Sequence, residues 1–254
     1  MYFKFTPELT NTKAHELYLI LLSIKNNMVG AKQLYWCLTV GFSVERAMML
    51  QKILSEKALL SIRESTRLDL SKIRFIAGFD SAYKDSKQYA AIVIYDTNTR
   101  DVVEKTFSIV EARVPYIPGL LAFREVPGYM RAYSKLTVKP DVILVDGHGL
   151  THPRAFGIAT HVGVVLGKPS IGVAKKKLYG EIVESYGRRL IRAHGLVVGE
   201  VLKHGSTELY VSIGYRVNLE DAVNIVKNLL TKEAKLPIPL QAADSYSKTL
   251  KRKY

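Results

Sequence analysis

The sequence predicts an α/β fold in which helices flank one mixed sheet. Three consecutive runs of apolar and β-branched residues come first, and helices and short strands then alternate along the chain. This order places antiparallel and parallel neighbours in a single sheet with helices on its faces. With 254 residues, of which 48% are hydrophobic, the chain can bury a substantial core.

The elements follow one another as this fold requires. Ser43 is placed to cap a helix leading into the core, because its side chain can accept from the amide of Arg46. Two strands joined by a polar turn form the expected hairpin, and a third follows. Strands are expected at 74–80, 90–96, 102–110, 142–145, 170–173 and, as several short ones, 181–213; helices are expected at 120–136, 154–166 and 219–230. This is the element order of a ribonuclease H-like core.

The chain divides into an N-terminal stretch, residues 1–42, and a body, residues 43–254. The first stretch lacks the dense Gly, Asp and His residues of the body and is predicted to form one or two helices. Two interpretations remain open: an addition specific to the protein's family, or an upstream extension that the natural product lacks. The body has no internal repeat and no Ser/Gly linker, which favours one compact domain.

The charge balance indicates an acidic partner. Lys and Arg number 37 against 23 Asp and Glu, which gives a formal net charge of +14. Such a field attracts polyanions, so nucleic acid is the first partner to consider. The alternative is that the chain is basic only because it comes from a basic proteome. Sequence motifs have to distinguish between the two explanations.

Cysteine and hydropathy patterns predict a cytoplasmic protein. Cys37 is the only cysteine, which excludes an internal disulfide and fits a reducing compartment. The apolar runs near the N-terminus are interrupted by polar residues and are too short to cross a bilayer, which needs roughly 20 apolar residues. No membrane partner is expected.

Three acids are candidates for a metal site. Asp80 and Asp146 each close an apolar run, and Glu125 lies on the predicted helix between them. Neighbouring strands would bring both aspartates to one edge of the sheet, where a buried charge is costly without a partner. Mg2+ or Mn2+ suits such carboxylates, and two ions can hold the attacking and leaving oxygens of a phosphodiester. The alternative is that the aspartates only cap loops and helix ends.

A loop rich in Gly and His follows Asp146. Its glycines let the backbone approach a ligand closely, and His148, His152 and Arg154 lie within it. Two histidines beside a strand-terminal aspartate favour a functional site over a structural role. A serine nucleophile elbow and a phosphate loop ending in Gly-Lys-Ser/Thr are both missing from the sequence.

Lys175 begins a run of three lysines after the predicted strand 170–173. That position puts it near the same sheet edge as Asp146, where a lysine can balance phosphate charge during cleavage. Taken alone, three lysines are usually surface charge; their place beside the carboxylates favours a site.

Several motifs, occurring in one order, resemble the endonuclease V family. The resemblance covers about residues 43–244, and the combination is far more specific than any single motif. The motifs are Gly78-Phe79-Asp80-Ser81-Ala82-Tyr83, Pro115-Tyr116-Ile117-Pro118-Gly119-Leu120-Leu121, Phe123-Arg124-Glu125, Asp146-Gly147-His148-Gly149, His152-Pro153-Arg154, Gly172-Val173-Ala174-Lys175 and Pro237-Ile238-Pro239-Leu240-Gln241-Ala242-Ala243-Asp244.

The resemblance implies a ribonuclease H-like fold, a catalytic domain over 43–254, and Mg2+-dependent hydrolysis in DNA repair, with Mn2+ able to substitute. The implied cut falls at the second phosphodiester bond 3′ to deoxyinosine, a deaminated adenine, and leaves 3′-hydroxyl and 5′-phosphate ends. Inosine-containing RNA is a further target that the family allows. A monomer is expected.

The resemblance also implies the chemical role of individual residues. The implied catalytic residues are Asp80, Glu125, Asp146, His152 and Lys175. The three acids among them are the implied metal ligands. Asp244 matches a position where many members carry a fourth acid and some carry histidine, which makes it a further candidate ligand.

Substrate contacts are implied for one side chain and four backbone positions. Tyr116 matches a residue that fills the gap left when the damaged base leaves the stack. An aromatic between two prolines loses little freedom on stacking, although a role in packing the loop is the alternative. Hypoxanthine is expected at the backbone of Gly119, Leu121, Gly147 and Ile158.

Two other functions compete with this interpretation. One is a ribonuclease H-like nuclease with another substrate, because a nuclease domain that acts in excision repair is similar. The other is a non-catalytic nucleic-acid-binding module. A module of that kind would lack one of the acids, and here Asp80, Glu125 and Asp146 are all present.

Overall fold

A computed structural model describes residues 42–63, 67–232 and 234–254 of the chain. The predicted N-terminal extension, residues 1–42, therefore lies outside the described residues except for its last position. Among the helices that are described, none combines the length and apolar character needed to cross a membrane.

The described strands form one mixed sheet, as the sequence predicts. The β1–β4 and β4–β5 pairs are parallel, and the other neighbours are antiparallel. In sheet order the strands are β3 Asp101–Glu111, β2 Lys87–Asp96, β1 Phe75–Lys84, β4 Val142–Asp146, β5 Ser170–Ala174, β9 Thr207–Tyr215, β8 Leu196–His204, β7 Arg188–Ala193 and β6 Glu181–Ser185.

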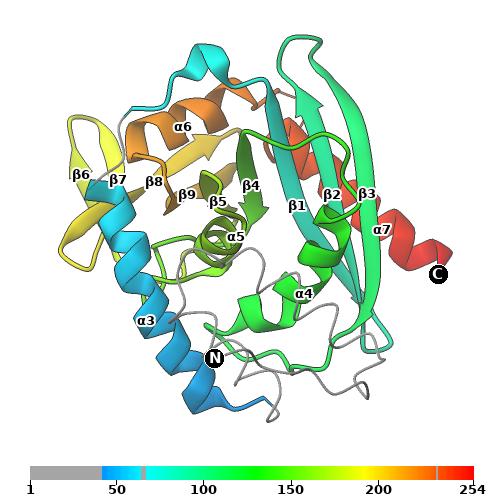
Figure 1. The fold of residues 1–254 in the computed structure, drawn as a ribbon. Coiled ribbons are helices and arrows are strands. Elements are labelled where there is room, and N and C mark those ends of the chain that lie inside the picture. Colours follow the sequence, from blue (N-terminus) through cyan, green and yellow to red (C-terminus); the bar gives the residue numbers. More distant parts are fainter. Residues whose placement is uncertain (1–41, 64–66, 233) are drawn as a thin grey trace, which may run out of the picture.

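Helices cover both faces of this sheet. Helices α4 and α5 pack on one face, and α7 crosses the other behind β1 and β2 (Figure 1). The core under α4 and α5 contains Phe79, Ile92, Ile143 and Tyr129, all fully buried. The helices are α3 Val44–Arg63, the short 3-10 helix η1 Leu70–Lys72, α4 Leu121–Tyr133, α5 Ile158–Leu166, α6 Leu219–Asn228 and α7 Ile238–Lys253.

The first hairpin is longer than predicted. Strand β1 continues four residues past Asp80 to Lys84, and the turn consists of Asp85 and Ser86, with φ angles of 48° and 62°. Two consecutive positive φ angles match the right-handed twist of a hairpin, so both strands can pair up to the turn. Asp80 thus lies inside β1, just after Phe79, the last residue that β1 pairs with β4.

Helix α5 begins four residues later than predicted, at Ile158. The preceding segment is held as a loop, because Gly157 N–H donates to the Gly149 carbonyl and Ala159 N–H to the His148 carbonyl. A Cβ on Gly157 would lie 2.2 Å from the His148 carbonyl oxygen, so this close approach requires glycine. Arg154 therefore belongs to the loop.

Helix α7 was not predicted from the sequence. It begins after Pro237, and the chain approaches β1 so closely there that a Cβ on Gly78 would lie 2.2 Å from the Pro239 carbonyl oxygen. Side chains alternate across a strand, so Asp80 points to the same face as Gly78, toward α7. This docking sets the position of Asp244 on α7.

Candidate active site

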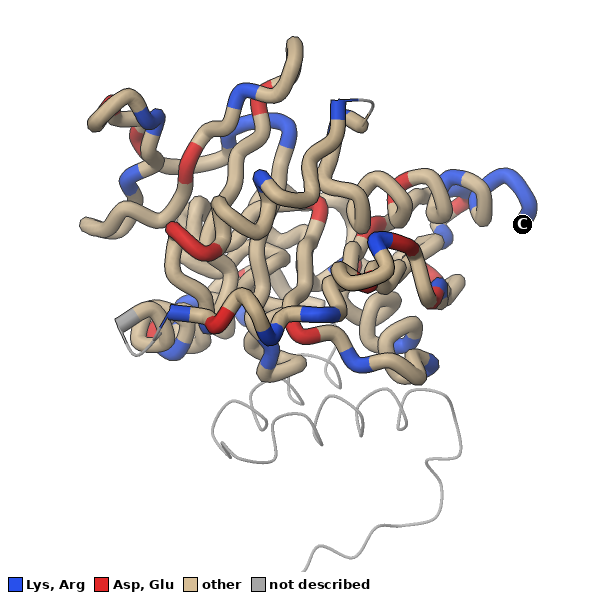
Figure 2. The backbone as a smooth tube through the Cα atoms, turned by 90° about the horizontal axis from the view of Figure 1, so that it is seen from above, with Lys and Arg blue, Asp and Glu red and all other residues tan. Residues whose placement is uncertain are grey.

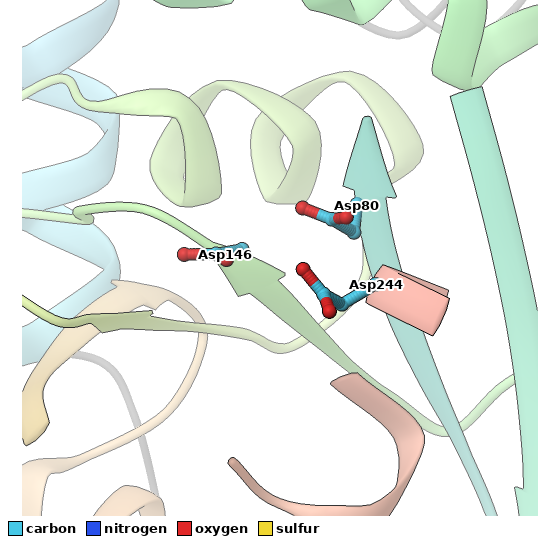
Figure 3. Close-up of side chains that lie close together, drawn as sticks. All are labelled: Asp80, Asp146 and Asp244. Carbon is cyan, nitrogen blue, oxygen red and sulfur yellow. The ribbon is translucent and has the colours of Figure 1, made fainter. Parts of the chain in front are cut away.

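Three aspartates from distant parts of the chain meet on the α7 face of the sheet. Asp80 on β1, Asp146 at the end of β4 and Asp244 on α7 each offer a carboxylate oxygen, and these oxygens lie within 4.8 Å of one another (Figure 3). The register explains the first two, because each follows a partner in the Phe79–Val145 pair of parallel strands. A group of this size and chemistry can hold a metal ion.

Burial and the neighbouring acids raise the pKa of Asp80. Burial, to 8% exposure, is the largest cause, the neighbouring charge of Asp146 adds to it, and the pKa reaches about 7. The Ser247 hydroxyl, 2.9 Å from Asp80 Oδ2, opposes the rise, and Asp244 adds to it. Like charges held this close are unfavourable unless a proton or a cation neutralises them.

Two lysines already balance part of this charge. Lys175 Nζ lies 3.0 Å from Asp146 Oδ2, and Lys248 Nζ lies 2.7 Å from Asp244 Oδ2, one turn along α7. Burial lowers the pKa of Lys175, but the Asp146 carboxylate outweighs burial and the pKa is raised. Lys175 thus lies where the sequence placed it, at the edge that carries Asp146, and remains charged.

Glu125 approaches the cluster from the opposite face of the sheet. Its carboxylate accepts hydrogen bonds from Tyr83, at 3.2 Å, and from Tyr129, at 2.9 Å. Burial is the largest cause that raises its pKa, to about 8; the tyrosine bonds oppose the rise, and Asp80 and Asp146 contribute to it. Glu125 therefore lies close enough to Asp80 and Asp146 for their charges to raise its pKa. Among the described residues, the compact group that could hold a metal consists of these two aspartates and Asp244.

Gln88, which none of the sequence motifs includes, helps to hold Glu125 in place. The Gln88 amide donates to the Glu125 carbonyl oxygen, at 2.9 Å, and to the Ser81 hydroxyl, at 2.8 Å. The Arg124 guanidinium lies 4.4 Å from the centre of the Tyr83 ring and donates to the Val114 carbonyl. Since Gln88 comes from β2, only the folded sheet reveals this support.

A pocket of about 210 Å3 adjoins the acids. Its walls come from two loops, one leading into α4 and one between β4 and α5, and from the lysines after β5. Gly147, His148 and Lys176 line the pocket. Gly147 and His148 directly follow Asp146 in the chain, and Lys176 directly follows Lys175, so the pocket lies next to the acids. The sequence-predicted substrate residues all line it: Tyr116, Gly119, Leu121, Gly147 and Ile158.

Tyr116 stands out from the surface beside this pocket. The exposed fraction of its side chain is 68%, whereas Tyr89 and Tyr129 are buried in the core. It lies in the loop ahead of α4, between Pro115 and Pro118, and this exposure does not fit the loop-packing alternative. An exposed aromatic ring on a stiff loop can stack on a base.

His152 lies in the pocket wall rather than in the group of three aspartates. It is 2% exposed, its Nε2 lies 2.9 Å from the Gly119 carbonyl oxygen, and its Nδ1 accepts from the Arg154 amide at 3.2 Å. These partners require a neutral ring protonated at Nε2, and burial lowers the pKa of His152 to about 4. Its catalytic role stays a prediction; the geometry shows it bound to the loop that carries Tyr116.

The strand order and the acids together define a class of protein. A mixed sheet in which β1, β4 and β5 run parallel beside an antiparallel hairpin, with acids where the parallel pairing ends, is a ribonuclease H-like fold with a site able to hold a metal ion.

Comparisons with known proteins identify the family within this class. A family model described as Endonuclease V matches residues 57–245. An Endonuclease V from Desulfurococcus amylolyticus is 52% identical over 211 residues, which cover 83% of this chain and 96% of the relative. An Endonuclease V from Aeropyrum pernix is 42% identical over 77% of this chain and 78% of its own.

Solved structures agree. A crystal structure of Endonuclease V from Bacillus subtilis gives a TM-score of 0.75 at 31% identity and covers 84% of this chain and 94% of that one. A Ciona intestinalis Endonuclease V, crystallised in complex with a 24mer DNA containing an inosine followed by a ribo-adenosine, gives 0.68 at 25% identity and covers 80% and 95%. The chain belongs to the endonuclease V family, which confirms the resemblance, and it is a nuclease.

Proposed function

We propose that the protein is a Mg2+-dependent endonuclease that cleaves DNA at the second phosphodiester bond 3′ to deoxyinosine and leaves 3′-hydroxyl and 5′-phosphate ends, with inosine-containing RNA as a further substrate. The observation that carries the proposal is the pocket that adjoins the three aspartates and is flanked by the exposed Tyr116. The Ciona intestinalis relative bound to inosine-containing DNA supports the substrate.

The carboxylates fit the proposed metal. Asp80, Asp146 and Asp244 supply oxygen ligands only, which Mg2+ and Mn2+ prefer, and Glu125 lies beside them. When bound, Mg2+ or Mn2+ supplies charge that polarises the phosphate and activates water for attack. The raised pKa of Asp80 supports this assignment, because a cation is the partner that stabilises the charged form.

Substrate binding rests on the pocket and the tyrosine. A base cannot be inspected inside a duplex, so it must leave the stack, which costs a few kcal/mol and less where pairing is weak. The pocket can receive a single base, and Tyr116 can occupy the vacated position and return part of the stacking energy. Gly147 and Lys176, which line the pocket, directly follow Asp146 and Lys175, and this supports a path of the strand in which the phosphates after the base lie near the acids.

Lys175 can balance the negative charge that develops on the reacting phosphate. Its ammonium group lies beside Asp146 and stays protonated, so it can pair with a phosphate oxygen as negative charge develops. Lys175 and Lys248 each pair with an aspartate of the group, so each would become available for phosphate when another cation binds the carboxylates.

The deciding experiment is cleavage of an end-labelled strand that contains one deoxyinosine. We expect one cut, mapped to the second bond on the 3′ side, in Mg2+ and none in EDTA. The matched strand with adenine at that position should stay intact under the same conditions.

Parallel reactions on an inosine-containing RNA and on undamaged duplex separate the alternatives. Cutting of all substrates alike would indicate a ribonuclease H-like nuclease with another specificity. Binding without cutting in Mg2+ or Mn2+ would indicate a non-catalytic module.

A further inference from the structure

Helix α3 contributes one buried polar side chain to the pocket, Gln51. It is 1% exposed, and every polar atom of its amide has a partner in the two loops that form the pocket walls. Its Nε2 donates to the carbonyl oxygens of Gly119, at 2.9 Å, and Phe156, at 3.0 Å, and its Oε1 accepts from Arg154 Nε at 2.5 Å. Gln51 lies N-terminal to the range 57–245 matched by the family model.

The Gly119 carbonyl is the centre of this network. It accepts from Gln51 Nε2, from Arg154 Nη2 at 2.8 Å and from His152 Nε2 at 2.9 Å. Three donors, one of them the charged Arg154 guanidinium, converge on this one oxygen and restrict the orientation of the carbonyl group. Gly119 has a φ of +79°, a conformation that other residues rarely adopt, and the three donors hold it there.

The network joins the two walls of the pocket. One wall is the loop with Tyr116, Pro118 and Gly119; the other is the loop between β4 and α5. Gln51 donates to both of them from a third element. The Gln51 amide donates one hydrogen bond to each loop, so together with His152 and Arg154 it fixes where the backbone of one wall lies relative to the other.

We propose that Gln51 is a positioning residue of the pocket: by tying Gly119 to Phe156 and Arg154, it holds the backbone groups of the two loops where they distinguish inosine from adenine. The inference rests on the proposed function, because it assumes that the pocket receives the base. Gln51 itself offers no free group to the base, so it acts through the loops. The Arg154 guanidinium donates to both Gln51 and Gly119, so it belongs to the same network.

The test compares Gln51→Met with the parent. Methionine keeps the length of the side chain and removes all three hydrogen bonds. Single-turnover cleavage of the inosine strand is measured across enzyme concentration. Binding to this strand and to a strand with adenine at the same position is measured in parallel, and the ratio of the two affinities gives the preference. We expect the preference for inosine to fall roughly tenfold or more, the discrimination expected when buried polar groups lose their partners. The loss should appear as a higher half-saturating concentration, with the maximal rate within a few-fold of the parent.

The matched control is Ser55→Ala, one turn further along α3. Ser55 is also buried, but its hydroxyl bonds only the Lys52 carbonyl of the same helix. It should lower thermal stability slightly and leave the preference unchanged. Affinity of both variants for the adenine strand and for Mn2+ should equal that of the parent.

Two results would overturn the inference: a folded Gln51→Met variant that keeps the parent's preference, or one that loses affinity for the inosine and adenine strands equally. If the methionine variant unfolds at the assay temperature, the same measurements are made on Gln51→Glu. Glutamate keeps the oxygen that accepts from Arg154 and lacks the N–H groups that donate to Gly119 and Phe156. A parent that shows no preference for inosine refutes the proposed function instead, so the two failures are distinct.

Discussion

At the level of single residues, the three aspartates are under opposing demands. Folding buries Asp80 and brings the three carboxylates within 4.8 Å of one another, and burial together with the neighbouring charges raises the pKa of Asp80. The same proximity is what a divalent cation requires. The acids whose charges repel one another in the fold are therefore those on which activity should depend.

The first prediction concerns activity. Asp80→Asn and Asp146→Asn should each lower the single-turnover rate on an inosine strand by roughly a thousandfold, because the amide keeps the size of the carboxylate and removes the charge worth several kcal/mol to the site. Gel-shift affinity should remain or rise slightly, since repulsion of phosphate is reduced. Asp141→Asn is the control, because Asp141 caps the amides of Arg74 and Phe75. Parent-like rates in the two variants would exclude the proposed metal site.

The second prediction concerns stability and pH. Asp80 and Glu125 have folded-state pKa values of about 7 and about 8, above their ordinary values of 3.8 and 4.5. Their contribution to stability is complete below the ordinary values and is lost as pH rises through 7 to 8. In EDTA the melting temperature should therefore fall as pH rises from about 6.5 to 8.5.

The variant Asp80→Asn tests this sign. It lacks one of the two groups, so its melting temperature should depend less on pH and exceed that of the parent near pH 8 in EDTA. His152 and His161, whose pKa values burial lowers to about 4, withdraw stability only below their ordinary value of 6.5 and do not affect that range. Equal slopes for parent and variant would mean that Asp80 is not the group responsible.

The third prediction concerns Tyr116. Tyr116→Ala should weaken binding to an inosine-containing duplex by roughly 1 to 3 kcal/mol, the value of one stacking contact, and should affect an inosine-containing single strand less. Only the duplex leaves a gap to fill. Tyr186→Ala, at the fully exposed turn between β6 and β7, is the control and should change neither affinity. Equal losses on duplex and single strand would favour loop packing.

At the level of elements, α7 shows how docking sets the geometry of the acids. The helix carries Asp244 and Ser247 to Asp80, and it can approach β1 because position 78 is glycine. Its buried positions are mostly small or proline residues, such as Pro239, Ala243 and Ser247, as close packing requires.

The fourth prediction follows from that contact. In Gly78→Ala the new methyl group would lie 2.2 Å from the Pro239 carbonyl oxygen, so the start of α7 must move and take Asp244 with it. Asp80 and Asp146 stay in the sheet. Mn2+ affinity should fall roughly tenfold, since one ligand is displaced, and higher Mn2+ should restore cleavage. If excess metal does not restore cleavage in a protein that is still folded, α7 docking does not control the site.

The same elements show how far the sequence predicts the structure. The strands, the order of the helices and the cap at Ser43 were predicted from local patterns, and the structure confirms them. Ser43 Oγ, for example, accepts a hydrogen bond from the Arg46 amide at 3.3 Å. Helix α7 was missed because small buried residues give little apolar periodicity. Asp80 was placed at a strand end because the apolar run stops there, whereas β1 continues to Lys84 by pairing with β2 alone.

Long-range contacts explain what else the sequence could not provide. Gln51 bonds residues 68 and 105 positions away, and Ser247 bonds Asp80 across 167 positions. No pattern of neighbouring residues carries such a pairing. The substrate residues that the family motifs imply do line one pocket, because the loop before α4 and the loop between β4 and α5 both border it.

At the level of the whole molecule, the net charge of +14 is not confined to the site. Lys and Arg positions are spread over the described elements and are frequent at the C-terminal end of α7 (Figure 2). Many are paired, as Arg188 is with Glu200 and Glu220. Lys176 and Lys177, by contrast, are exposed and line the pocket, so the basic residues most relevant to a substrate lie beside the acids.

The last prediction concerns salt. Lysines that contact phosphate release counterions, so affinity for an inosine strand should fall steeply as NaCl rises, with a slope in log–log form of roughly −0.7 for each contact on a single strand. Lys176→Ala and Lys177→Ala should each reduce that slope by about one contact and weaken inosine and adenine strands alike, because phosphate carries no sequence information. Arg100→Ala is the control: Arg100 lies in the β2–β3 turn, at the sheet edge opposite the acids, and should leave the slope unchanged. The slopes are measured by fluorescence anisotropy. They also distinguish the role of the lysines from that of Gln51, because loss of Gln51 should change the preference for inosine and leave the slope unchanged. An affinity that stays flat as salt rises would show that the basic surface beside the pocket is not the face that binds nucleic acid.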